Sequence, residues 1–367
     1  MSGPPPIAER LYGKEVVICV GSGGVGKTTT SAALALALAR RGRRVCVVTI
    51  DPARRLATAL GLDELSNEPH RIDGAVQGDG ELWAMMLDAK RTFDEVITRL
   101  EEDPVRREEI LANPIYRELS GAIAGSHELS AIVKLYELHE EHSFDVVVLD
   151  TPPSRNALDF LEAPQRLLGF LEGRALQVFL SPGGLTTRLF GRGSALVFSV
   201  FARVTGVDLL GDLSVFFGSM SGVLDGFSER TKRVAALLRE SGTAFVIVTS
   251  PEHEPAREAR FLAERLEQAG MRTAELVVNR VQQPALVGID REELERALGA
   301  ELDGELAARI ARAAASIDLL ARRDARSLEH LADELDQPSP VVVPQLTEEI
   351  QDLGGLARVA DVLETAG

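Results

Sequence analysis

Cysteine is scarce in this 367-residue chain, which contains only two, and the CxxC spacing occurs nowhere. Cys19 and Cys46 lie inside the apolar runs VVICV and VCVVTI, where a cysteine is most often a small core side chain. The six histidines are scattered. Even His139 and His142, three residues apart on a predicted helix, lack nearby ligands, so the sequence argues against a metal site built from thiolates and imidazoles.

Long apolar runs and an excess of basic charge are also missing. No stretch approaches the roughly 18 unbroken apolar residues that would span a bilayer, and the opening MSGPPPIAERLYGKE has no apolar signal-peptide core. The formal net charge is -16, whereas binding to nucleic acid or to anionic lipid requires clustered Lys and Arg. We expect a cytoplasmic protein with no nucleic-acid partner and no stable membrane insertion. The composition still allows local basic patches.

What the chain does contain is a repeated alternation of apolar strands and helical segments. At 45% hydrophobic residues, it can bury a large core in one enlarged or two compact units. Continuous β-branched runs are typical of parallel strands that are covered on both faces, so we predict an α/β fold with a mostly parallel sheet between helices. The predicted strands are 15–20, 44–50, 82–87, 144–150, 244–249, 275–279 and 340–344.

Helical segments separate these strands. The stretch TTSAALALALARRG (29–42) alternates leucines like a strand, but its alanines and the stop at Gly42 favour a helix. Longer helical tracts are predicted over 90–142, 160–235 and 291–335. The polar stretch 66–80 is interpreted as a surface connection.

A glycine-rich loop carries the strongest functional signal. The stretch GSGGVGKTTT (21–30) satisfies G-x-x-x-x-G-K-[ST] and lies after a strand and before a helix. Glycines let backbone N–H groups face phosphate oxygens, and the helix N-terminus adds positive potential. Lys27 is predicted to reach the terminal phosphates of a nucleoside triphosphate, and the Thr28 hydroxyl to coordinate Mg²⁺. A chance match in a chain this long is on the order of one in a hundred.

Two aspartates follow other strands of the same predicted sheet. Asp51 comes just after 44–50, and Asp150 ends the run FDVVVLD. Ligands of open α/β sheets bind where the strands end, and an aspartate after an apolar run is the usual Mg²⁺-holding residue of such sites. Either residue alone is as typical of a turn or a helix cap.

Five motifs in this order, GSGGVGKTT, DPA, DTPPS, VVNRV and VPQLTEEIQDL, resemble the arsenite-pump ATPase (ArsA) family, which includes the eukaryotic ATPase that carries tail-anchored membrane proteins. The resemblance spans 14–363 and implies a P-loop NTPase fold. It implies one ATPase domain over 1–367, with a nucleotide-binding core formed by 14–89, 143–165 and 240–367, and a helical insert formed by 90–142 and 166–235.

The resemblance also implies roles for single residues toward ATP and Mg²⁺. Asp51 would orient the attacking water, and Asp150 would hold the metal and sense the γ-phosphate. Asn279 would read adenine, although alone it is as typical of a strand-end cap, and a loop from Pro344 would close over the base. The remaining expected nucleotide contacts come from the loop itself: Gly21, Ser22, Gly23, Gly24, Val25, Gly26, Lys27, Thr28 and Thr29.

Ser22 departs from the family, whose members usually carry at this position a lysine that reaches the partner's phosphates across a dimer. Three explanations stay open. Arg54, Arg55 or Arg155 could supply the missing charge, the chain could pair with a paralogue that carries the lysine, or it could be a slow homodimeric ATPase. The missing CxxC argues against a zinc-clamped dimer. The chain also lacks the cluster of thiols that would bind arsenite, which argues against an arsenite-stimulated pump subunit.

The segment 185–227 holds six of the thirteen phenylalanines and only six charged residues. In the targeting members of the family, the corresponding insert builds a dimeric groove for a hydrophobic client helix, whereas buried packing of the same helices is the alternative. We therefore predict a dimeric, Mg²⁺-dependent ATPase that couples its nucleotide state to a hydrophobic client or partner. A weakly hydrolysing interaction subunit of a heteromer with a paralogue is the alternative, and a partitioning ATPase or a small-molecule kinase fits the sequence less well.

Overall fold

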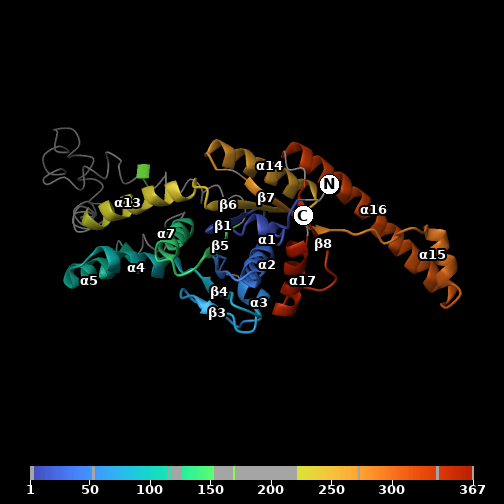
Figure 1. Ribbon diagram of the computed structural model, residues 1–367, viewed down its shortest axis with the longest axis horizontal. Helices are drawn as coiled ribbons and strands as arrows, with labels where there is room; N and C mark the ends of the chain where they lie inside the picture. The colour runs from blue at the N-terminus through green and yellow to red at the C-terminus, as the bar shows by residue number, and fades with distance from the viewer. Residues whose placement is uncertain are drawn as a thin grey trace, which may run out of the picture. The chain divides into compact units, whose positions relative to one another are not determined.

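The computed structural model describes residues 4–51, 54–114, 116–117, 126–152, 168–169, 221–271, 273–335 and 339–365. The chain folds as two compact units (Figure 1). The first, here called the sheet unit, consists of Met1–Met86, Phe144–Leu158 and Ser241–Gly367. The second, the helical unit, consists of Leu87–Ser143 and Asp159–Glu240.

The sheet unit contains an eight-stranded sheet in the order β3-β4-β2-β5-β1-β6-β7-β8. All neighbouring strands run parallel except β3, which pairs antiparallel with β4 at one edge. This confirms the predicted α/β fold with a mostly parallel sheet. The strands are β1 (Val16–Val20), β2 (Arg44–Thr49), β3 (His70–Arg71), β4 (Glu81–Met86), β5 (Val146–Asp150), β6 (Thr243–Thr249), β7 (Thr273–Val281) and β8 (Val341–Pro344).

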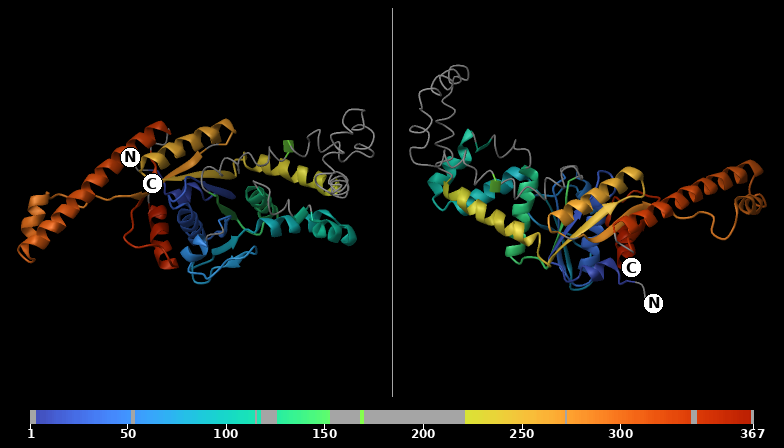
Figure 2. Two further views of the ribbon diagram at one scale, coloured as in Figure 1. Left: turned by 180° about the vertical axis from the view of Figure 1, so that it is seen from behind. Right: turned by 90° about the horizontal axis from the view of Figure 1, so that it is seen from above.

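Helices of the sheet unit lie on both faces of this sheet (Figures 1 and 2). One face carries α2 (Lys27–Arg40) and α17 (Leu353–Thr365), and the opposite face carries α14 (His253–Gln268) and the base of α16 (Gly304–Glu334). The remaining helices of this unit are α1 (Ile7–Arg10), α3 (Arg55–Ala59) and α15 (Arg291–Leu298). Such two-sided cover explains why the strand sequences are apolar without alternation.

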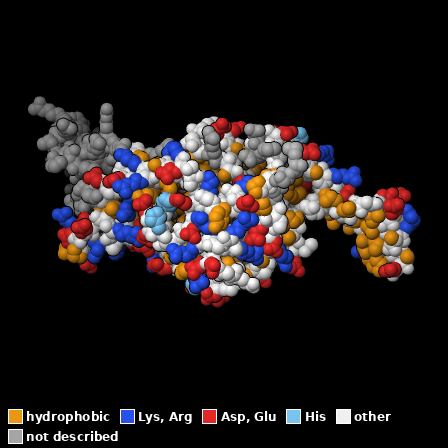
Figure 3. All heavy atoms as spheres, viewed as in Figure 1, with side chains coloured by type: hydrophobic (Ala, Val, Ile, Leu, Met, Phe, Trp, Pro, Cys, Tyr) orange, Lys and Arg blue, Asp and Glu red, His pale blue; other side chains and the backbone are white. Residues whose placement is uncertain are grey.

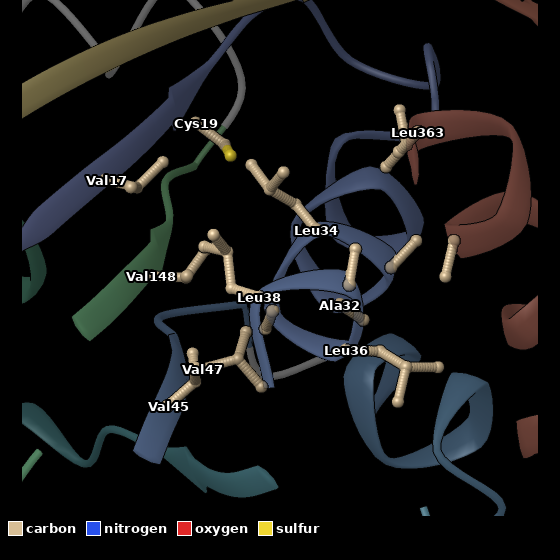
Figure 4. Packing of buried hydrophobic residues seen from close by; sticks show 14 of the residues in the cluster. Val17, Cys19, Ala32, Leu34, Leu36, Leu38, Val45, Val47, Val148 and Leu363 are labelled. Carbon is tan, nitrogen blue, oxygen red and sulfur yellow. The ribbon is translucent and has the colours of Figure 1, made fainter. Parts of the chain in front are cut away.

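The core of the sheet unit is built around α2, whose residues 30–39 are buried on every side. In Figure 4, Leu34 and Leu38 point toward the strands, whereas Leu36 points away from them. Burial all round explains the alternating leucines in an alanine-rich helix, because every face of α2 has a neighbour. Cys19 and Cys46 form no disulfide with each other and are fully buried in β1 and β2, as predicted, and burial raises the pKa of the Cys19 thiol to about 12.

The polar stretch 66–80, which we interpreted from the sequence as a surface connection, contains one short strand. His70 and Arg71 form β3 and pair with Ala84 and Trp83 of β4. Both β3 residues are exposed, so no apolar periodicity marks them. Backbone pairing at a sheet edge alone defines this strand.

Gly80 lies where the chain enters β4, against the end of α2. A Cβ at this position would overlap the backbone carbonyl of Ala39, which a side-chain movement cannot relieve. We expect Gly80→Ala to destabilise the sheet unit by roughly 2–4 kcal/mol, as overpacking against fixed backbone does. Urea unfolding followed by circular dichroism measures the change. Gly13→Ala is the matched control, because its Cβ would meet nothing within 4 Å, and equal unfolding midpoints for the two variants would contradict the packing described.

The helical unit contains α4 (Ala89–Leu100), α5 (Pro104–Ala112), α7 (Ser126–Glu140) and α13 (Ser221–Leu237) among its described residues. Helices α4, α7 and α13 pack on one another. Of the predicted client segment 185–227, positions 185–220 lie outside the described residues. Phe227 is buried, stacks on Phe93 and contacts the cluster of Val96 and Val133. No helix within the described ranges combines the length and apolarity needed to cross a bilayer.

The distal half of α16 carries a row of exposed apolar side chains. Figure 3 shows orange, hydrophobic surface on the part of the molecule where Figure 1 labels α15. Leu306, Ile310, Ile317 and Leu320 are 38–43% exposed. Their spacing of 4, 7 and 3 residues places them on one helix face. Further along α16 the buried Asp324 and Leu331 lie near the same face, because the base of the helix packs against α14 and β7. The exposed row therefore lies on the same face of α16 that is buried against α14 and β7 at the base of the helix.

Candidate active site

Three neighbouring parallel strands end together at one edge of the sheet. Cys19 of β1 and Thr49 of β2 are both in register with Asp150, the last residue of β5. The loop 21–26 follows β1 directly, and Asp51 follows β2. The strand order therefore brings the loop and both aspartates to the same place, which is where ligands of open parallel sheets bind.

The loop adopts a conformation that requires glycine. Gly24 and Gly26 have φ angles of 79° and 90°, in the left-handed region, and Gly26 is the N-cap of α2. A Cβ at Gly21 would overlap the backbone carbonyl of Val248 in the neighbouring β6. No side chain caps the N-terminus of the 14-residue α2. Its first N–H groups are thus left for an anion, which the helix dipole also favours.

Lys27 begins α2 and folds back beneath the loop. Its Nζ donates to the carbonyl oxygen of Ser22 at 2.9 Å, and the side chain is buried. Burial lowers the pKa of this ammonium, and the negative charge of Asp150 opposes the shift. A desolvated ammonium held at this point interacts strongly with phosphate oxygens, because little water competes.

Asp150 is 1% exposed and is held by two hydroxyls. Its Oδ2 accepts from Thr28 Oγ1 at 2.7 Å and from Thr49 Oγ1 at 2.9 Å, whereas its Oδ1 is buried with no hydrogen-bond partner. Burial raises the pKa of this carboxyl to about 6, against the two hydroxyl hydrogen bonds and the charge of Lys27. A buried carboxylate oxygen without a partner beside a threonine hydroxyl suits a hard cation with oxygen ligands.

Thr28 and Asp150 suit Mg²⁺, which needs few protein ligands, better than a metal ion whose ligands all come from the protein. Within the described ranges, no group of three or more His, Cys, Asp or Glu could hold a metal ion. Mg²⁺ commonly takes one or two carboxylates and completes its shell with water and substrate phosphates. Thr28 and Asp150 would thus hold the ion together with a nucleotide.

Asp51 lines the cavity of this site and is partly exposed. Its side chain is 21% exposed, and its Oδ2 lies 3.3 Å from a guanidinium nitrogen of Arg55. The backbone N–H of Asp51 donates to Thr49 Oγ1 at 3.2 Å. Thr49 thus contacts both aspartates, and it is a site residue that the sequence analysis missed. Its only signal was a threonine at the end of an apolar strand directly before an acidic turn.

Asn279 and the segment after β8 form another part of the site. Asn279 Nδ2 donates to the carbonyl oxygen of Val25 at 2.9 Å, and its Oδ1 accepts from the backbone N–H of Arg280 at 2.9 Å. These bonds fix the amide against the glycine-rich loop, with one donor hydrogen and one acceptor lone pair left over. Pro344 and residues 345–350 face it across a cavity.

The cavity has a volume of about 750 Å³. Nine of the predicted site residues line it: Gly23, Gly24, Gly26, Lys27, Thr28, Thr29, Asp51, Asn279 and Pro344. Gly21, Ser22, Val25 and Asp150 lie behind this wall, and Asp150 contacts the site through Thr28. Further lining residues that were not assigned to the nucleotide from the sequence include Thr58 and Arg280. Arg155 lies outside the described residues.

A parallel sheet with a glycine-rich loop between its first strand and an uncapped helix, and with two aspartates at adjacent strand ends, defines a P-loop NTPase. The sequence profile of the anion-transporting ATPase (ArsA) family matches residues 14–285, more than half of the chain. The chain belongs to this family and is an ATPase.

Named relatives support the same assignment. An ATPase called GET3 from Malassezia globosa is 30% identical over 284 residues, which cover 77% of each chain. An ATPase ASNA1 homolog from Trypanosoma cruzi is 28% identical over 307 residues, covering 77% of this chain and 78% of the relative. A putative arsenical pump-driving ATPase from Halobacterium salinarum is 30% identical over 178 residues, covering 46% of this chain and 26% of the relative.

Proposed function

We propose that this ATPase hydrolyses ATP with Mg²⁺ in the cytoplasm as a dimer and couples its nucleotide state to the binding of a hydrophobic client or partner protein. The convergence of Lys27, Thr28, Asp51 and Asp150 at one end of a single cavity carries the proposal. The same cavity is also lined by Asn279 and by the segment from Pro344, and its volume of about 750 Å³ is in the range of small-molecule and cofactor sites.

Each of these side chains has a separate role in the proposed reaction. Lys27 and the loop N–H groups bind the terminal phosphates, while Thr28 and Asp150 hold Mg²⁺, which neutralises charge that develops on the phosphate oxygens. Asp51 orients the water that attacks the γ-phosphorus and accepts its proton. The bond from phosphorus to the β–γ bridging oxygen breaks, and its electron pair stays on ADP. Asn279 and the segment from Pro344 bind the adenine.

Coupling to a client rests on family likeness and on sequence composition. Relatives of this chain carry the names GET3 and ASNA1, and the apolar segment 185–227 has the composition of a client-binding insert. On the face of the protein shown in Figure 3, acidic and basic side chains are interspersed. With the net charge of -16, this surface favours a protein client over nucleic acid.

The coupling can be tested with a fluorescent apolar helical peptide of about 20 residues, the length of a membrane-spanning helix. Its affinity is measured by anisotropy for the full chain with ADP and for the Asp51→Asn variant with ATP. Because coupling between two ligands changes affinity typically 5- to 150-fold, we expect a difference in that range. A peptide with aspartates in its centre is the control. Equal affinities in the two nucleotide states contradict a nucleotide-driven client cycle.

The second candidate function, a weakly hydrolysing subunit of a heteromer with a paralogue, is favoured by two observations. Ser22 places an uncharged side chain where relatives are expected to carry a lysine, and its Oγ is buried without a hydrogen-bond partner. The exposed apolar row of α16 offers surface for another chain. In this alternative, Ser22 weakens the phosphate site of the partner and leaves binding at the chain's own loop intact.

Substitutions at Ser22 separate these candidates. A lysine that makes a charge-assisted bond only in the transition state is worth roughly 10- to 150-fold in turnover. In a self-sufficient homodimer, Ser22→Lys should therefore raise the turnover number by up to that factor, whereas Ser22→Ala should stay within about twofold, because no hydrogen bond is lost. Phosphate release at saturating ATP measures both. No gain from Ser22→Lys, together with acceleration of the wild type by a lysine-bearing paralogue, supports the heteromer instead.

A further inference from the structure

Positive charge around the cavity is sparse at its phosphate end. Among the described lining residues, the cations are Lys27, Arg55 and Arg280. Arg280 follows Asn279 at the adenine end, and Lys27 is buried beneath the loop. A triphosphate with one divalent metal carries more negative charge than one ammonium neutralises. Among the described residues that line the cavity, Arg55 is therefore the remaining cation that can serve the terminal phosphate.

Arg55 has a partner that it can leave at little cost. Its guanidinium lies 3.3 Å from the Asp51 carboxylate, and the Arg55 side chain is 63% exposed. Ion pairs this exposed contribute at most about 1 kcal/mol. The pairing follows from local structure, because α3 begins at Arg55, four residues after Asp51. Arg54, the preceding residue, does not line the cavity and instead faces Glu64 at 3.9 Å.

Arg55 is also close enough to influence the loop. Arg55 and Lys27 line the same cavity, together with Gly23, Gly24 and Gly26 of the loop. Two like charges at this end of the cavity repel each other until an anion enters between them. A planar guanidinium with paired N–H donors matches phosphate oxygens in geometry as well as charge.

We propose that Arg55 is a catalytic arginine supplied by the chain itself, which leaves Asp51 for the γ-phosphate when ATP binds and returns to Asp51 when only ADP remains. The proposal rests on the proposed function, since it needs ATP in this cavity. While paired, Arg55 occupies the Asp51 carboxylate that would accept the proton of water. When ATP is bound, the guanidinium stabilises the charge on the γ-phosphate as water adds and ADP leaves, and Asp51 is released as the proton acceptor.

The test compares Arg55→Ala and Arg55→Lys with Arg54→Ala as the matched control on the same segment. Phosphate release by the full chain with Mg²⁺ gives kcat and KM, and competition between ADP and a non-hydrolysable ATP analogue gives the preference for the γ-phosphate. We expect Arg55→Ala to lower kcat about 10- to 100-fold and to raise KM by up to about tenfold, because the guanidinium contacts the γ-phosphate of bound ATP before the reaction as well as during it. The preference for the ATP analogue should fall about tenfold. Arg55→Lys should lie between, and Arg54→Ala should match the wild type within about twofold.

Two results overturn the inference while ATP hydrolysis by the wild type stands. One is an Arg55→Ala variant that equals Arg54→Ala in both measurements, and the other is an Arg55→Ala variant with increased kcat, which would make the pair purely inhibitory. Circular dichroism of each variant excludes misfolding, and Arg55→Lys preserves the charge if Arg55→Ala is unstable. A wild type that binds no adenine nucleotide overturns the proposed function itself, and Arg55 with it.

Discussion

Asp51→Asn is expected to lower the turnover number for ATP about 100- to 10,000-fold, the usual contribution of a positioned proton acceptor. Asparagine keeps the size and hydrogen-bonding reach of the side chain but cannot accept the proton of the attacking water. Asp51 lines the cavity beside Lys27 but is not one of the groups assigned to the phosphates or the metal, so affinity for ATP should change little. Single-turnover hydrolysis, with ATP binding measured separately, distinguishes the two effects.

Asp63→Asn is the matched control, because Asp63 is exposed and does not line the cavity. It should hydrolyse ATP at the rate of the wild type. Equal single-turnover rates for the wild type and Asp51→Asn would show that this aspartate is not part of the chemistry. That outcome favours the interaction subunit, which binds nucleotide as a switch or scaffold and barely hydrolyses it.

Lys27→Met is expected to weaken ATP binding itself by about 100-fold or more. The buried ammonium of Lys27 is poised to make charge-assisted bonds to two phosphate groups, and each such bond contributes about 1.5–3 kcal/mol. Methionine fills similar space without charge and also loses the bond to the Ser22 carbonyl oxygen. Calorimetric titration with ATP and Mg²⁺ measures the loss.

Lys14→Met serves as the control, because Lys14 belongs to the same sheet unit but binds the carbonyl oxygen of Ser241 on the exposed surface. We expect its ATP affinity to match the wild type. The two catalytic-site variants thus have different signatures: Asp51→Asn binds ATP without turnover, and Lys27→Met does not bind. Retained affinity in Lys27→Met would contradict the assignment of the phosphates to this loop.

Much of the sheet was predictable because its physical signal is local and strong. Parallel strands covered on both faces are apolar throughout, and seven such runs correspond to β1, β2 and β4–β8. The strand β3 escaped prediction, because His70 and Arg71 are exposed and their pairing with β4 uses only backbone groups. Hydrophobic periodicity alone could not identify α2 as a helix, because a helix that is buried on all sides carries no amphipathic pattern.

The sequence predicted which strand ends form the site, but not the individual side-chain contacts within it. A glycine-rich loop after one strand and aspartates after two others must meet if the strands are parallel neighbours, and the order β2-β5-β1 makes them so. The sequence could not assign the second hydroxyl on Asp150 to Thr49, because that contact depends on strand register. It could not choose between Arg54 and Arg55 either, since only the start of α3 decides which of them faces Asp51.

The most direct test of the account is a crystal structure of the full chain with a non-hydrolysable ATP analogue and Mg²⁺. We predict the terminal phosphates between the loop N–H groups and the Lys27 ammonium, the metal at Thr28 and Asp150, and the adenine between Asn279 and the segment after Pro344. Nucleotide bound elsewhere, or a metal distant from Asp150, would contradict it.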